Sequence, residues 1–238
     1  VPESIRADFD EELSQWVASG WLVPYDELKL GPPRGLIPLM AVNQPNKEKV
    51  RPVMDYRELN SHITAHTAEA DVCAEQLRRW RRRGKNVAIV DLRRAYLQLH
   101  VDEHLWPFQT VMIDGSRHCL TRMGFGLSVG PEVMRAVVKI ILAQDSKLER
   151  GVLGFVDDLL VDESVVPAEE VVEHFQRFGL ECKPPVRVSD GARVLGLRVS
   201  CGRHSELQWT RGGPVEAPPV TMTRRAVFSW CARLVAQF

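Results

Sequence analysis

The sequence predicts an α+β fold in which helices alternate with antiparallel hairpins. Segments whose apolar residues recur three or four positions apart, as in amphipathic helices, stand between short apolar runs with the composition of strands. Several of these runs come in pairs around a polar turn, which is typical of antiparallel neighbours. Acidic residues stand at the ends of two separate strand-like runs, at Asp91 and at Asp157-Asp158.

The composition is that of an ordinary globular protein. The 238 residues are enough for one large domain or two smaller ones, and 45% of them are hydrophobic, which supports a substantial core. The 31 basic and 31 acidic residues give a formal net charge of zero. Charge as a whole therefore gives no reason to expect a nucleic-acid partner, and such a partner must be argued from local features.

Cysteine usage and hydropathy give an expectation about the cellular setting. The five cysteines are odd in number, scattered and free of C-x-x-C spacing, which favours reduced thiols in a cytosolic or nuclear protein. No apolar run reaches the ~18–20 residues of a transmembrane helix, and no signal peptide opens the chain. We therefore expect a protein that is neither secreted nor bound in a membrane.

The first third of the chain predicts two helices and a hairpin. The first helix runs from about residue 4 to residue 19 and stops at Gly20. Residues 36–42 and 50–54 are expected to form two strands around a polar turn. The second helix, at residues 70–83, ends in a basic run. This run is either a solvated helix end, which the helix dipole favours, or a phosphate-binding surface.

The middle of the chain predicts a buried strand, a second strand and a glycine-rich loop. Residues 87–90 form an apolar run of the doubly buried kind, and Asp91 follows where the chain leaves the sheet. A strand is expected at residues 108–113. The glycine-rich loop at residues 123–131 ends in a proline suited to the first position of a helix, which continues to about Gln144.

The last third predicts one more helix and a final hairpin. The helix covers residues 168–178 and is followed by Gly179. Strands are expected at residues 194–199 and 207–210, and a linker rich in glycine and proline precedes a last helix that begins near Thr223.

The adjacent acids Asp157 and Asp158 lie between two apolar runs and are expected at the turn of a hairpin. Alone, the pair has two interpretations: a solvated hairpin tip, or a site for a cation. Asp91 stands at the end of another strand. Three acids meeting in one cleft would form an oxygen-rich site for hard divalent cations, and paired Mg²⁺ ions in such sites clamp both oxygens of a phosphoryl transfer.

Five segments in order carry a resemblance to a known family. From about residue 20 to its end, the chain resembles the reverse transcriptase part of an LTR-retrotransposon (gypsy/Pao-like) or retroviral polyprotein. The matching segments are R-P-V-M-D-Y-R-E-L-N at residues 51–60, D-L-R-R-A-Y-L-Q-L-H-V at 91–101, M-G-F-G-L-S-V-G-P at 123–131, F-V-D-D at 155–158, and Leu195-Gly196.

The resemblance implies a right-hand polymerase with fingers, a palm built of an antiparallel sheet plus helices, and a partial thumb. It places the fingers at residues 1–66 and 99–128, the palm at 67–98 and 129–207, and a linker with the truncated start of the thumb at 208–238.

The resemblance also implies roles for individual residues. Asp91, Asp157 and Asp158 would be catalytic and would hold two Mg²⁺ ions, with Mn²⁺ as an alternative. Tyr96 would act as a steric gate that excludes a 2′-hydroxyl. The full nucleotide-binding set would be Arg51, Arg94, Ala95, Tyr96, Phe125 and Gly126. Asp55 and Arg57 would contact the template, and Leu195 and Gly196 would form the primer grip.

The implied function is reverse transcription, that is, RNA- and DNA-templated DNA polymerisation, in which dNMP is transferred to a primer 3′-hydroxyl. The implied partners are an RNA or DNA template with its primer, dNTP, and RNase H and integrase segments downstream in the same polyprotein. The setting would be a cytoplasmic virus-like particle or the nucleus. Two alternatives stay open: an RNA-dependent RNA polymerase, and a catalytically weak or domesticated palm that only binds nucleic acid.

Three positions depart from the family pattern or extend it. Asn43-Gln44 stands where related sequences commonly carry lysines, which predicts weaker dNTP binding unless Lys47 or Lys49 substitutes. Gly124 replaces a proline and is expected to loosen its loop. Lys183 is a candidate for the lysine that protonates pyrophosphate.

Overall fold

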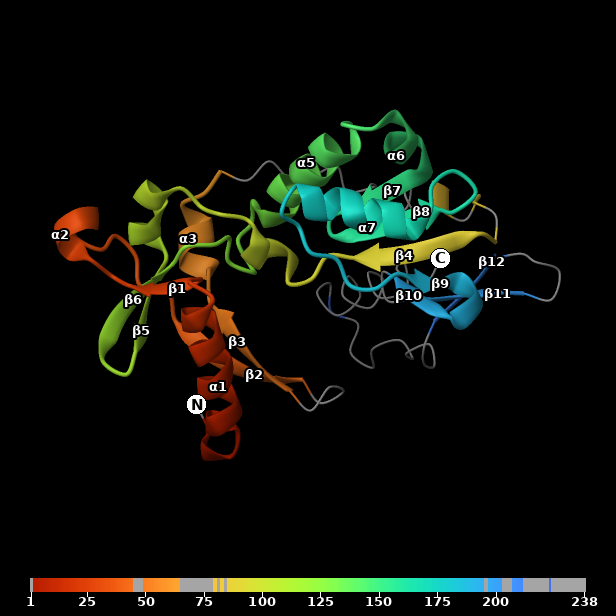
Figure 1. Ribbon diagram of the computed structural model, residues 1–238. Helices are drawn as coiled ribbons and strands as arrows, with labels where there is room; N and C mark the ends of the chain where they lie inside the picture. The colour runs from red at the N-terminus through yellow and green to blue at the C-terminus, as the bar shows by residue number, and fades with distance from the viewer. Residues whose placement is uncertain are drawn as a thin grey trace. The chain divides into compact units, whose positions relative to one another are not determined.

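The computed structural model describes residues 2–44, 49–64, 79–80, 82–83, 85–194, 197–202, 207–211 and 223. Helices and antiparallel sheets are mixed along the chain, which confirms the predicted α+β class at that level (Figure 1). The chain divides into two compact units. Unit 1 comprises Val1–Ala68 and Arg94–Met134, and unit 2 comprises Glu69–Arg93 and Arg135–Phe238.

Unit 1 contains a hairpin and a three-stranded antiparallel sheet, ordered β1-β6-β5. Its elements in chain order are α1 (Glu3–Ala18), β1 (Leu22–Pro24), α2 (Glu27–Leu30), β2 (Leu39–Gln44), β3 (Lys49–Met54), α3 (Arg57–Ser61), the 3₁₀ helices η1 (Ala95–Gln98) and η2 (Glu103–Phe108), β5 (Thr110–Ile113) and β6 (Ser116–Leu120).

Helix α1 packs one face against the core of unit 1. Phe9, Leu13 and Trp16 lie four and three positions apart and are buried, so one face of the helix enters the core, as the sequence predicts. The helix packs against the hairpin of β2 and β3, beside which it lies in Figure 1. Met54 and Tyr56, at and after the end of β3, are buried in the same core.

Unit 2 is built on a four-stranded antiparallel sheet with the order β7-β8-β4-β9. Its elements are β4 (Val87–Asp91), α5 (Gly130–Leu142, whose first residues belong to unit 1), α6 (Ser146–Gly151), β7 (Val152–Phe155), β8 (Asp158–Asp162), α7 (Ala168–Arg177), β9 (Val186–Arg187), the 3₁₀ helix η3 (Val188–Asp190), β10 (Ala192–Val194), β11 (Leu197–Cys201) and β12 (Leu207–Arg211).

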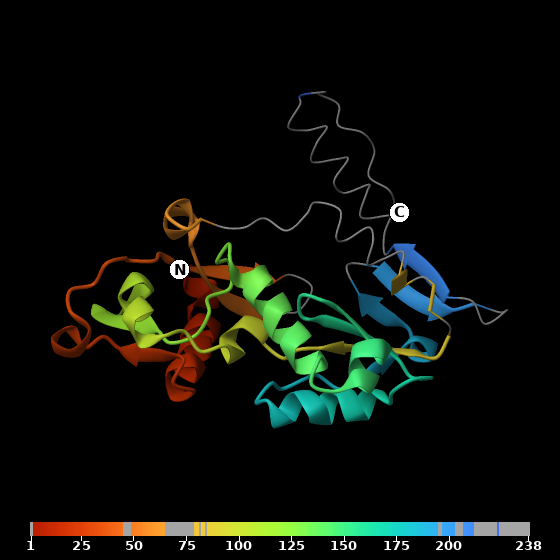
Figure 2. The same cartoon turned by 90° about the horizontal axis from the view of Figure 1, so that it is seen from above.

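Both faces of this sheet are covered. On β4, Val87 and Ile89 point to one face, where they join Leu160 and the strands β10 to β12 in a buried cluster. The alternate residues of β4 point to the other face, on which α7 packs against β4 and β8. Figure 2 shows α7 (turquoise) and β11–β12 (blue) on opposite sides of β4 (yellow). The continuous apolar run of β4 is explained by this two-sided burial.

The edge strand β9 is short. It has two residues, and it pairs with β4 at Ala88 and Ile89 only. Pro184 and Pro185 come directly before it and carry no backbone N–H, so they cannot donate to a strand ladder.

The predicted helices and strands that fall on described residues agree with the structure, with one exception, whereas the short elements β1, α2, α3, β6, α6 and β9 were not predicted. The continuous strand predicted at residues 194–199 is wrong, because β10 ends at Val194 and β11 begins at Leu197 as its antiparallel neighbour. Both strands are needed to cover the sheet face, and Ala192 and Val199 are buried there. The predicted linker at residues 212–219, and all but a few residues of the predicted helices at 70–83 and from Thr223, lie outside the described residues.

Within the described residues, no helix is both long and apolar enough to cross a membrane.

Candidate active site

Asp91, Asp157 and Asp158 meet at one end of the unit 2 sheet. The register of β4 and β8 places Asp91, the last residue of β4, directly opposite Asp158, the first residue of β8. Opposed residues of antiparallel strands share a face, with Cβ atoms about 4.5–5.5 Å apart. Asp157 precedes Asp158 in the turn of the β7–β8 hairpin. Two residues distant in sequence are thus brought together by strand pairing.

The turn of this hairpin is held in a conformation that its sequence disfavours. Val156 and Asp157 join the strands, and Phe155 lies opposite Asp158. Val156 has a φ of 55°, which costs a β-branched residue about 1–2 kcal/mol, and glycine is the usual residue where a tight hairpin needs such a value. The backbone N–H of Leu92 donates to the carbonyl of Asp157 over 3.2 Å, which ties the turn to the chain leaving β4. Strain of this kind concentrates at functional sites.

Burial and mutual repulsion raise the pKa values of two of the three carboxyl groups. Burial raises the pKa of Asp158 to about 6, and the neighbouring charges of Asp157 and Asp91 act in the same direction. The pKa of Asp157 is also raised, by burial first and then by the charge of Asp91. Both side chains are half-buried, unlike the acids of a solvated hairpin tip. Such a cluster favours a bound proton or a bound cation.

The donor chemistry of the cluster suits Mg²⁺, which takes carboxylate oxygens as ligands. Among the described residues, however, no three His, Cys, Asp or Glu side chains are already arranged around a common ion position. The residue types of Asp91, Asp157 and Asp158 therefore fit a divalent cation, and their side chains must adjust to hold it.

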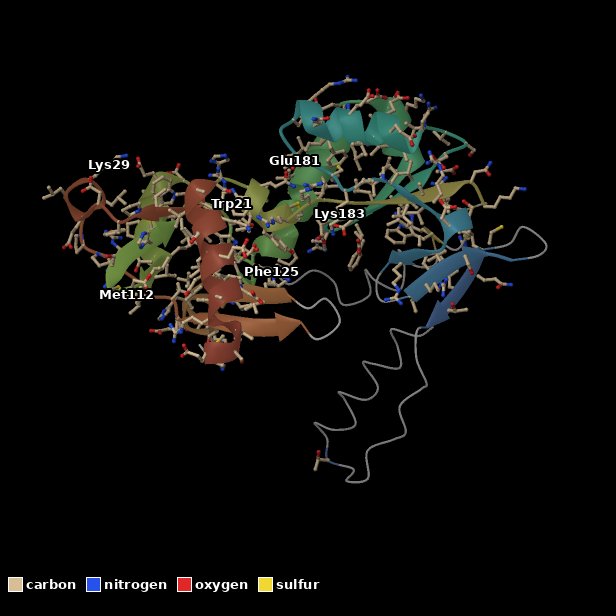
Figure 3. The ribbon with its side chains drawn as sticks, turned by 60° about the horizontal axis from the view of Figure 1, so that its bottom comes forward. Trp21, Lys29, Met112, Phe125, Glu181 and Lys183 are labelled. Atoms are coloured by element: carbon tan, nitrogen blue, oxygen red, sulfur yellow. The ribbon has the colours of Figure 1, made fainter. Side chains whose placement is uncertain are left out.

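A basic side chain also contacts the cluster. Lys183 forms an ion pair through its Nζ with Oδ2 of Asp91. The segment that carries it follows α7 and runs beside the residues after β4 (Figure 3). The thiol of Cys182 in that segment has a pKa raised to about 11 by burial and by Asp91, so it stays protonated at neutral pH. The sequence suggested Lys183 as a candidate for the lysine that protonates pyrophosphate. No sequence pattern predicted its contact with Asp91.

Within unit 1, three of the residues predicted to bind nucleotide lie together. The guanidinium carbon of Arg51 on β3 lies 4.3 Å from the centroid of the Phe125 ring. The rings of Phe125 and Tyr96 meet edge to face, with centroids 5.5 Å apart. Phe125 is 52% exposed, and Figure 3 labels it on the glycine-rich loop. A guanidinium beside exposed aromatic surface is chemistry that can bind phosphate and base.

Two other predicted nucleotide contacts have their own surroundings in unit 1. Arg94 adopts a positive φ of 50°, and its guanidinium lies 3.3 Å from a carboxylate oxygen of Glu12 and over the ring of Trp21. Ala95 is buried and begins η1. The side chain of Arg94 is thus engaged with α1 and with the residue that precedes β1, and it must leave Glu12 to reach a phosphate.

Asn60 is a site residue that sequence reasoning missed. Its side-chain amide donates to the carbonyl of Gly126 over 2.9 Å, and its Oδ1 accepts from the backbone N–H of Ser128 over 2.9 Å. Asn60 therefore holds the glycine-rich loop from α3. Asn60 could have been selected from the sequence because it is the last residue of the motif at residues 51–60.

Gly124 lies where the glycine-rich loop approaches a buried tyrosine. A Cβ atom at this position would fall 1.8 Å from the hydroxyl oxygen of Tyr56. Tyr56 is 2% exposed, and its hydroxyl donates to Oε1 of Gln109 over 3.0 Å. The glycine therefore permits close packing of the loop on a buried tyrosine, and the expectation that it loosens the loop stays a prediction.

The predicted template contacts Asp55 and Arg57 are paired with each other. The carboxylate of Asp55 accepts from the backbone N–H of Arg57 over 3.1 Å and from its guanidinium Nε over 2.8 Å. These hydrogen bonds lower the pKa of Asp55 to about 2. Asp55 is largely covered while Arg57 is exposed, so the acid orients a guanidinium that faces solvent.

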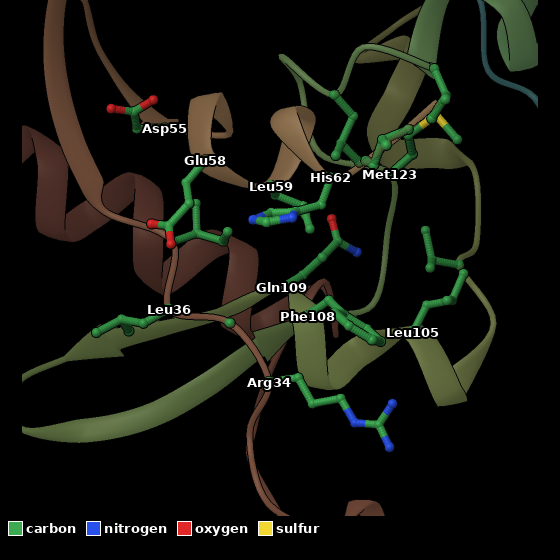
Figure 4. A pocket seen from close by; sticks show the side chains of 16 residues that line it. Arg34, Leu36, Asp55, Glu58, Leu59, His62, Leu105, Phe108, Gln109 and Met123 are labelled. Carbon is green, nitrogen blue, oxygen red and sulfur yellow. The ribbon is translucent and has the colours of Figure 1, made fainter. Parts of the chain in front are cut away.

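A cavity of about 640 Å³ adjoins Asp55 in unit 1. Figure 4 shows its lining side chains, which are mainly apolar, with the polar groups of Asp55, Glu58, His62, Arg34 and Gln109 among them. The volume is in the range of sites for small molecules.

Several predicted positions lie outside the described residues. These are Leu195 and Gly196, predicted as the primer grip, and Lys47, predicted as one substitute for the missing fingers lysines. Their roles stay predictions.

No protein-family model matches the chain, and no curated protein matches it. Solved structures do. The native prototype foamy virus protease-reverse transcriptase matches with a TM-score of 0.68 and 20% identity, over 89% of this chain and 27% of that one. The fold is reverse transcriptase-like.

A second foamy viral protease-reverse transcriptase, in complex with dsDNA, matches with a TM-score of 0.74 and 16% identity, over 98% of this chain and 48% of that one. The foamy viral protease-reverse transcriptase dRH in complex with ds DNA matches with a TM-score of 0.68 and 18% identity, over 84% of this chain and 34% of that one. The chain thus spans between about a quarter and a half of the length of these reverse transcriptase structures.

Proposed function

We propose that this chain is the polymerase part of a reverse transcriptase and extends a primer on an RNA or DNA template. The observation that carries the proposal is the placement of Asp91 opposite Asp158, with Asp157 beside them in a strained turn. The reverse transcriptase-like fold supports it. We also propose the assignment of fingers, palm and partial thumb, and an origin in an LTR-retrotransposon (gypsy/Pao-like) or retroviral polyprotein, because five motifs occur in the family's order.

In this proposal Asp91, Asp157 and Asp158 hold two Mg²⁺ ions, or Mn²⁺ in their place. When bound, the ions would lower the pKa of the primer 3′-hydroxyl and neutralise charge that develops on the α-phosphate. The strand pairing and the tied turn fix the backbone positions of the three acids, so that only their side chains must adjust when ions bind.

We propose that the dNTP is bound by the six residues assigned from the motifs. Arg51 would place its guanidinium fork on phosphate oxygens, since that geometry suits them. Tyr96, packed edge to face on Phe125, would exclude a 2′-hydroxyl from a fixed position. Asn60 would keep Gly126 in place through its hydrogen bond. Arg94 and Ala95 would lie along the triphosphate.

Template and primer would be bound by further residues of the same motifs. Arg57, oriented by Asp55, would contact the template, and Leu195-Gly196 would form the primer grip. The foamy viral neighbours in complex with dsDNA support a nucleic-acid partner. We further propose RNase H and integrase segments in the same polyprotein, and a location in cytoplasmic virus-like particles or the nucleus.

Primer extension tests the proposal. With Mg²⁺, dNTPs and a primed RNA or DNA template, the wild type is expected to extend the primer. Asp157→Asn should lower the rate about a hundredfold or more, because a catalytic ion contributes several kcal/mol and each 1.36 kcal/mol is a factor of ten. Glu149→Gln, which neutralises an exposed acid on α6 of the same unit, should leave the rate unchanged.

Three results would contradict the proposal. Undiminished extension by Asp157→Asn would remove the carboxylates from the chemistry. Use of rNTPs as readily as dNTPs would indicate an RNA polymerase. Salt-dependent binding of template and primer without any turnover would indicate a domesticated palm that only binds nucleic acid.

A further inference from the structure

Lys183 is held in a fixed register against Asp91. Its backbone N–H donates to the carbonyl of Asp91 over 2.8 Å, and the N–H of Arg93 donates to the carbonyl of Glu181 over 2.9 Å. Cys182, between these two bonds, forms an antiparallel bridge with Leu92. Two hydrogen bonds and a bridge therefore anchor the backbone from Glu181 to the N–H of Lys183, independently of the lysine side chain, which ends on Oδ2 of Asp91.

The charge of Lys183 acts on the whole carboxylate cluster. Besides pairing with Asp91, the ammonium lowers the pKa values of Asp157 and Asp158, against the larger effects that raise them. Like charges directly opposite one another on neighbouring strands destabilise a sheet. Lys183 thus supplies part of the positive charge that the cluster needs.

The ion pair between Lys183 and Asp91 contributes little free energy, although the backbone of the lysine is held in place. The side chains of Lys183 and Asp91 are 52% and 35% exposed, and exposed pairs contribute little because water screens them. The lysine ammonium is a compact charge on a flexible four-carbon stem, so it can leave Oδ2 while its backbone stays in place. A divalent cation bound at Asp91 needs carboxylate oxygens in its own coordination sphere.

We propose that Lys183 is a tethered counter-ion that competes with divalent cations for Asp91, so that it sets the cation concentration at which the carboxylate cluster fills. The inference rests on the proposed function, because it takes Asp91, Asp157 and Asp158 to be the cation site. In this role Lys183 is a positioning residue. Its ammonium stabilises the cluster when no divalent cation is bound and is displaced when one binds.

The chain offers a matched control for this pair. Lys147 of α6 lies 2.8 Å from a carboxylate oxygen of Glu170 on α7, in the same unit. Its side chain and that of Glu170 are 42% and 38% exposed, which is close to the exposure of the Lys183 pair. Removing either lysine charge has the same effect on net charge, but only one of the two carboxylates belongs to the cluster.

Titration with Mn²⁺ tests the inference without nucleotide or nucleic acid. Binding to the full chain is followed by electron paramagnetic resonance at pH 7.5 and low salt. Lys183→Met should bind Mn²⁺ about two- to fivefold more tightly than the wild type, the range that an exposed ion pair supports. Lys183→Arg, which keeps the charge, should stay near the wild type, and so should Lys147→Met.

Thermal unfolding provides a second readout. Without divalent cation, Lys183→Met should melt at a lower temperature than the wild type, and saturating Mn²⁺ should close that difference, because an ion then supplies the missing charge. If Lys183→Met does not fold, Lys183→Gln takes its place in both measurements. Near-ultraviolet circular dichroism verifies the fold of each variant.

The outcomes separate the inference from the proposed function. Equal or weaker Mn²⁺ binding by Lys183→Met, or the same tightening in Lys147→Met, overturns the inference even if the wild type extends primers. Tighter binding by Lys183→Met alone supports it even if no primer is extended. A wild type that binds no Mn²⁺ overturns both the inference and the metal site.

Discussion

Val156 determines how the hairpin presents Asp157 and Asp158. Its φ of 55° lies where side chains with a branched Cβ are rarely found, yet Phe155 before it and Asp158 at the end of the turn are fixed by the pairing of β7 with β8. The folded chain therefore bears a local cost at this residue, which the surrounding sheet offsets.

Replacing Val156 by glycine should stabilise the protein. Glycine removes the steric cost of the positive φ, about 1–2 kcal/mol, and loses part of that gain to the greater entropy of the unfolded chain. We expect a net increase of about 0.5–1 kcal/mol in the free energy of unfolding, measured by urea denaturation.

Two control variants show whether the gain in stability comes from the positive φ. Val156→Ala keeps a Cβ at the same φ, so it should recover less stability than Val156→Gly. Val165→Gly removes a half-buried side chain in unit 2 at a residue without a positive φ and should destabilise the protein. A Val156→Gly variant that is less stable than Val156→Ala would show that the turn is not strained.

At the scale of elements, the glycine-rich loop is held from two directions. Asn60 of α3 binds it at Gly126 and Ser128, and Tyr56 occupies the space where a side chain at Gly124 would lie. The loop is therefore a packed part of unit 1, and its position depends on residues of the motif at 51–60.

Replacing Gly124 by alanine should destabilise unit 1. The new Cβ would stand 1.8 Å from the hydroxyl oxygen and 2.2 Å from Cζ of a buried tyrosine, so either the loop or the ring must move. Overpacking of this kind typically costs about 1–3 kcal/mol, which urea denaturation can measure.

The matched control is Gly154→Ala on β7. There the nearest atom to the new Cβ is a methyl carbon of Val138 at 3.1 Å, which can give way by a few tenths of an ångström. Its cost should be clearly smaller. Equal costs for the two variants would contradict the close packing of Gly124 on Tyr56.

Helices and strands could be predicted where the apolar residues form one helix face or one continuous run. The buried face of α1 and the apolar run of β4 both depend on periodicity, which the sequence displays directly. The separation of β10 from β11 was missed because Leu195, Leu197 and Val199 alternate with other residues as in a single strand, and because both strands bury residues in the same cluster.

For the whole molecule, a formal net charge of zero means that general charge repulsion contributes little to the pH dependence of stability near neutrality. The pH dependence of stability is then determined by individual groups whose pKa values are shifted. Asp158 has a pKa raised from 3.8 to about 6 in the folded chain. A carboxyl group raised in this way stabilises the fold where it is protonated and loses that contribution as pH rises through about 6.

Asp158→Asn should therefore gain stability relative to the wild type between pH 4 and pH 7. Well below pH 4 the two should be similar, because Asp158 is then protonated in both the folded and the unfolded chain. By pH 7 the variant should be more stable by about 1–2 kcal/mol, after allowance for partial exposure. Urea denaturation at pH 4, 6 and 7.5 measures the difference.

Glu149→Gln serves as the control for that series, since its side chain is exposed on α6. It should show no such change across the range. A stability difference between Asp158→Asn and the wild type that is the same at all three pH values would contradict the raised pKa.

How much of the site was predictable differs between its parts. The residues Asp91, Asp157 and Asp158 could be selected because each follows or interrupts an apolar run, but their pairing depends on register, which no single strand displays. The contact of Arg51 with Phe125 and the pairing of Lys183 with Asp91 join residues far apart in sequence. Neither has a pattern that periodicity or spacing could reveal.

The two-residue strand β9 also bears on how this protein behaves at high concentration. A long open edge beside β4 would invite a strand from another molecule, and so would lead toward aggregation. Here the edge is short, it follows two consecutive prolines, and a charged lysine comes directly before them. These features discourage edge-to-edge association on this side of the sheet that carries Asp91 and Asp158.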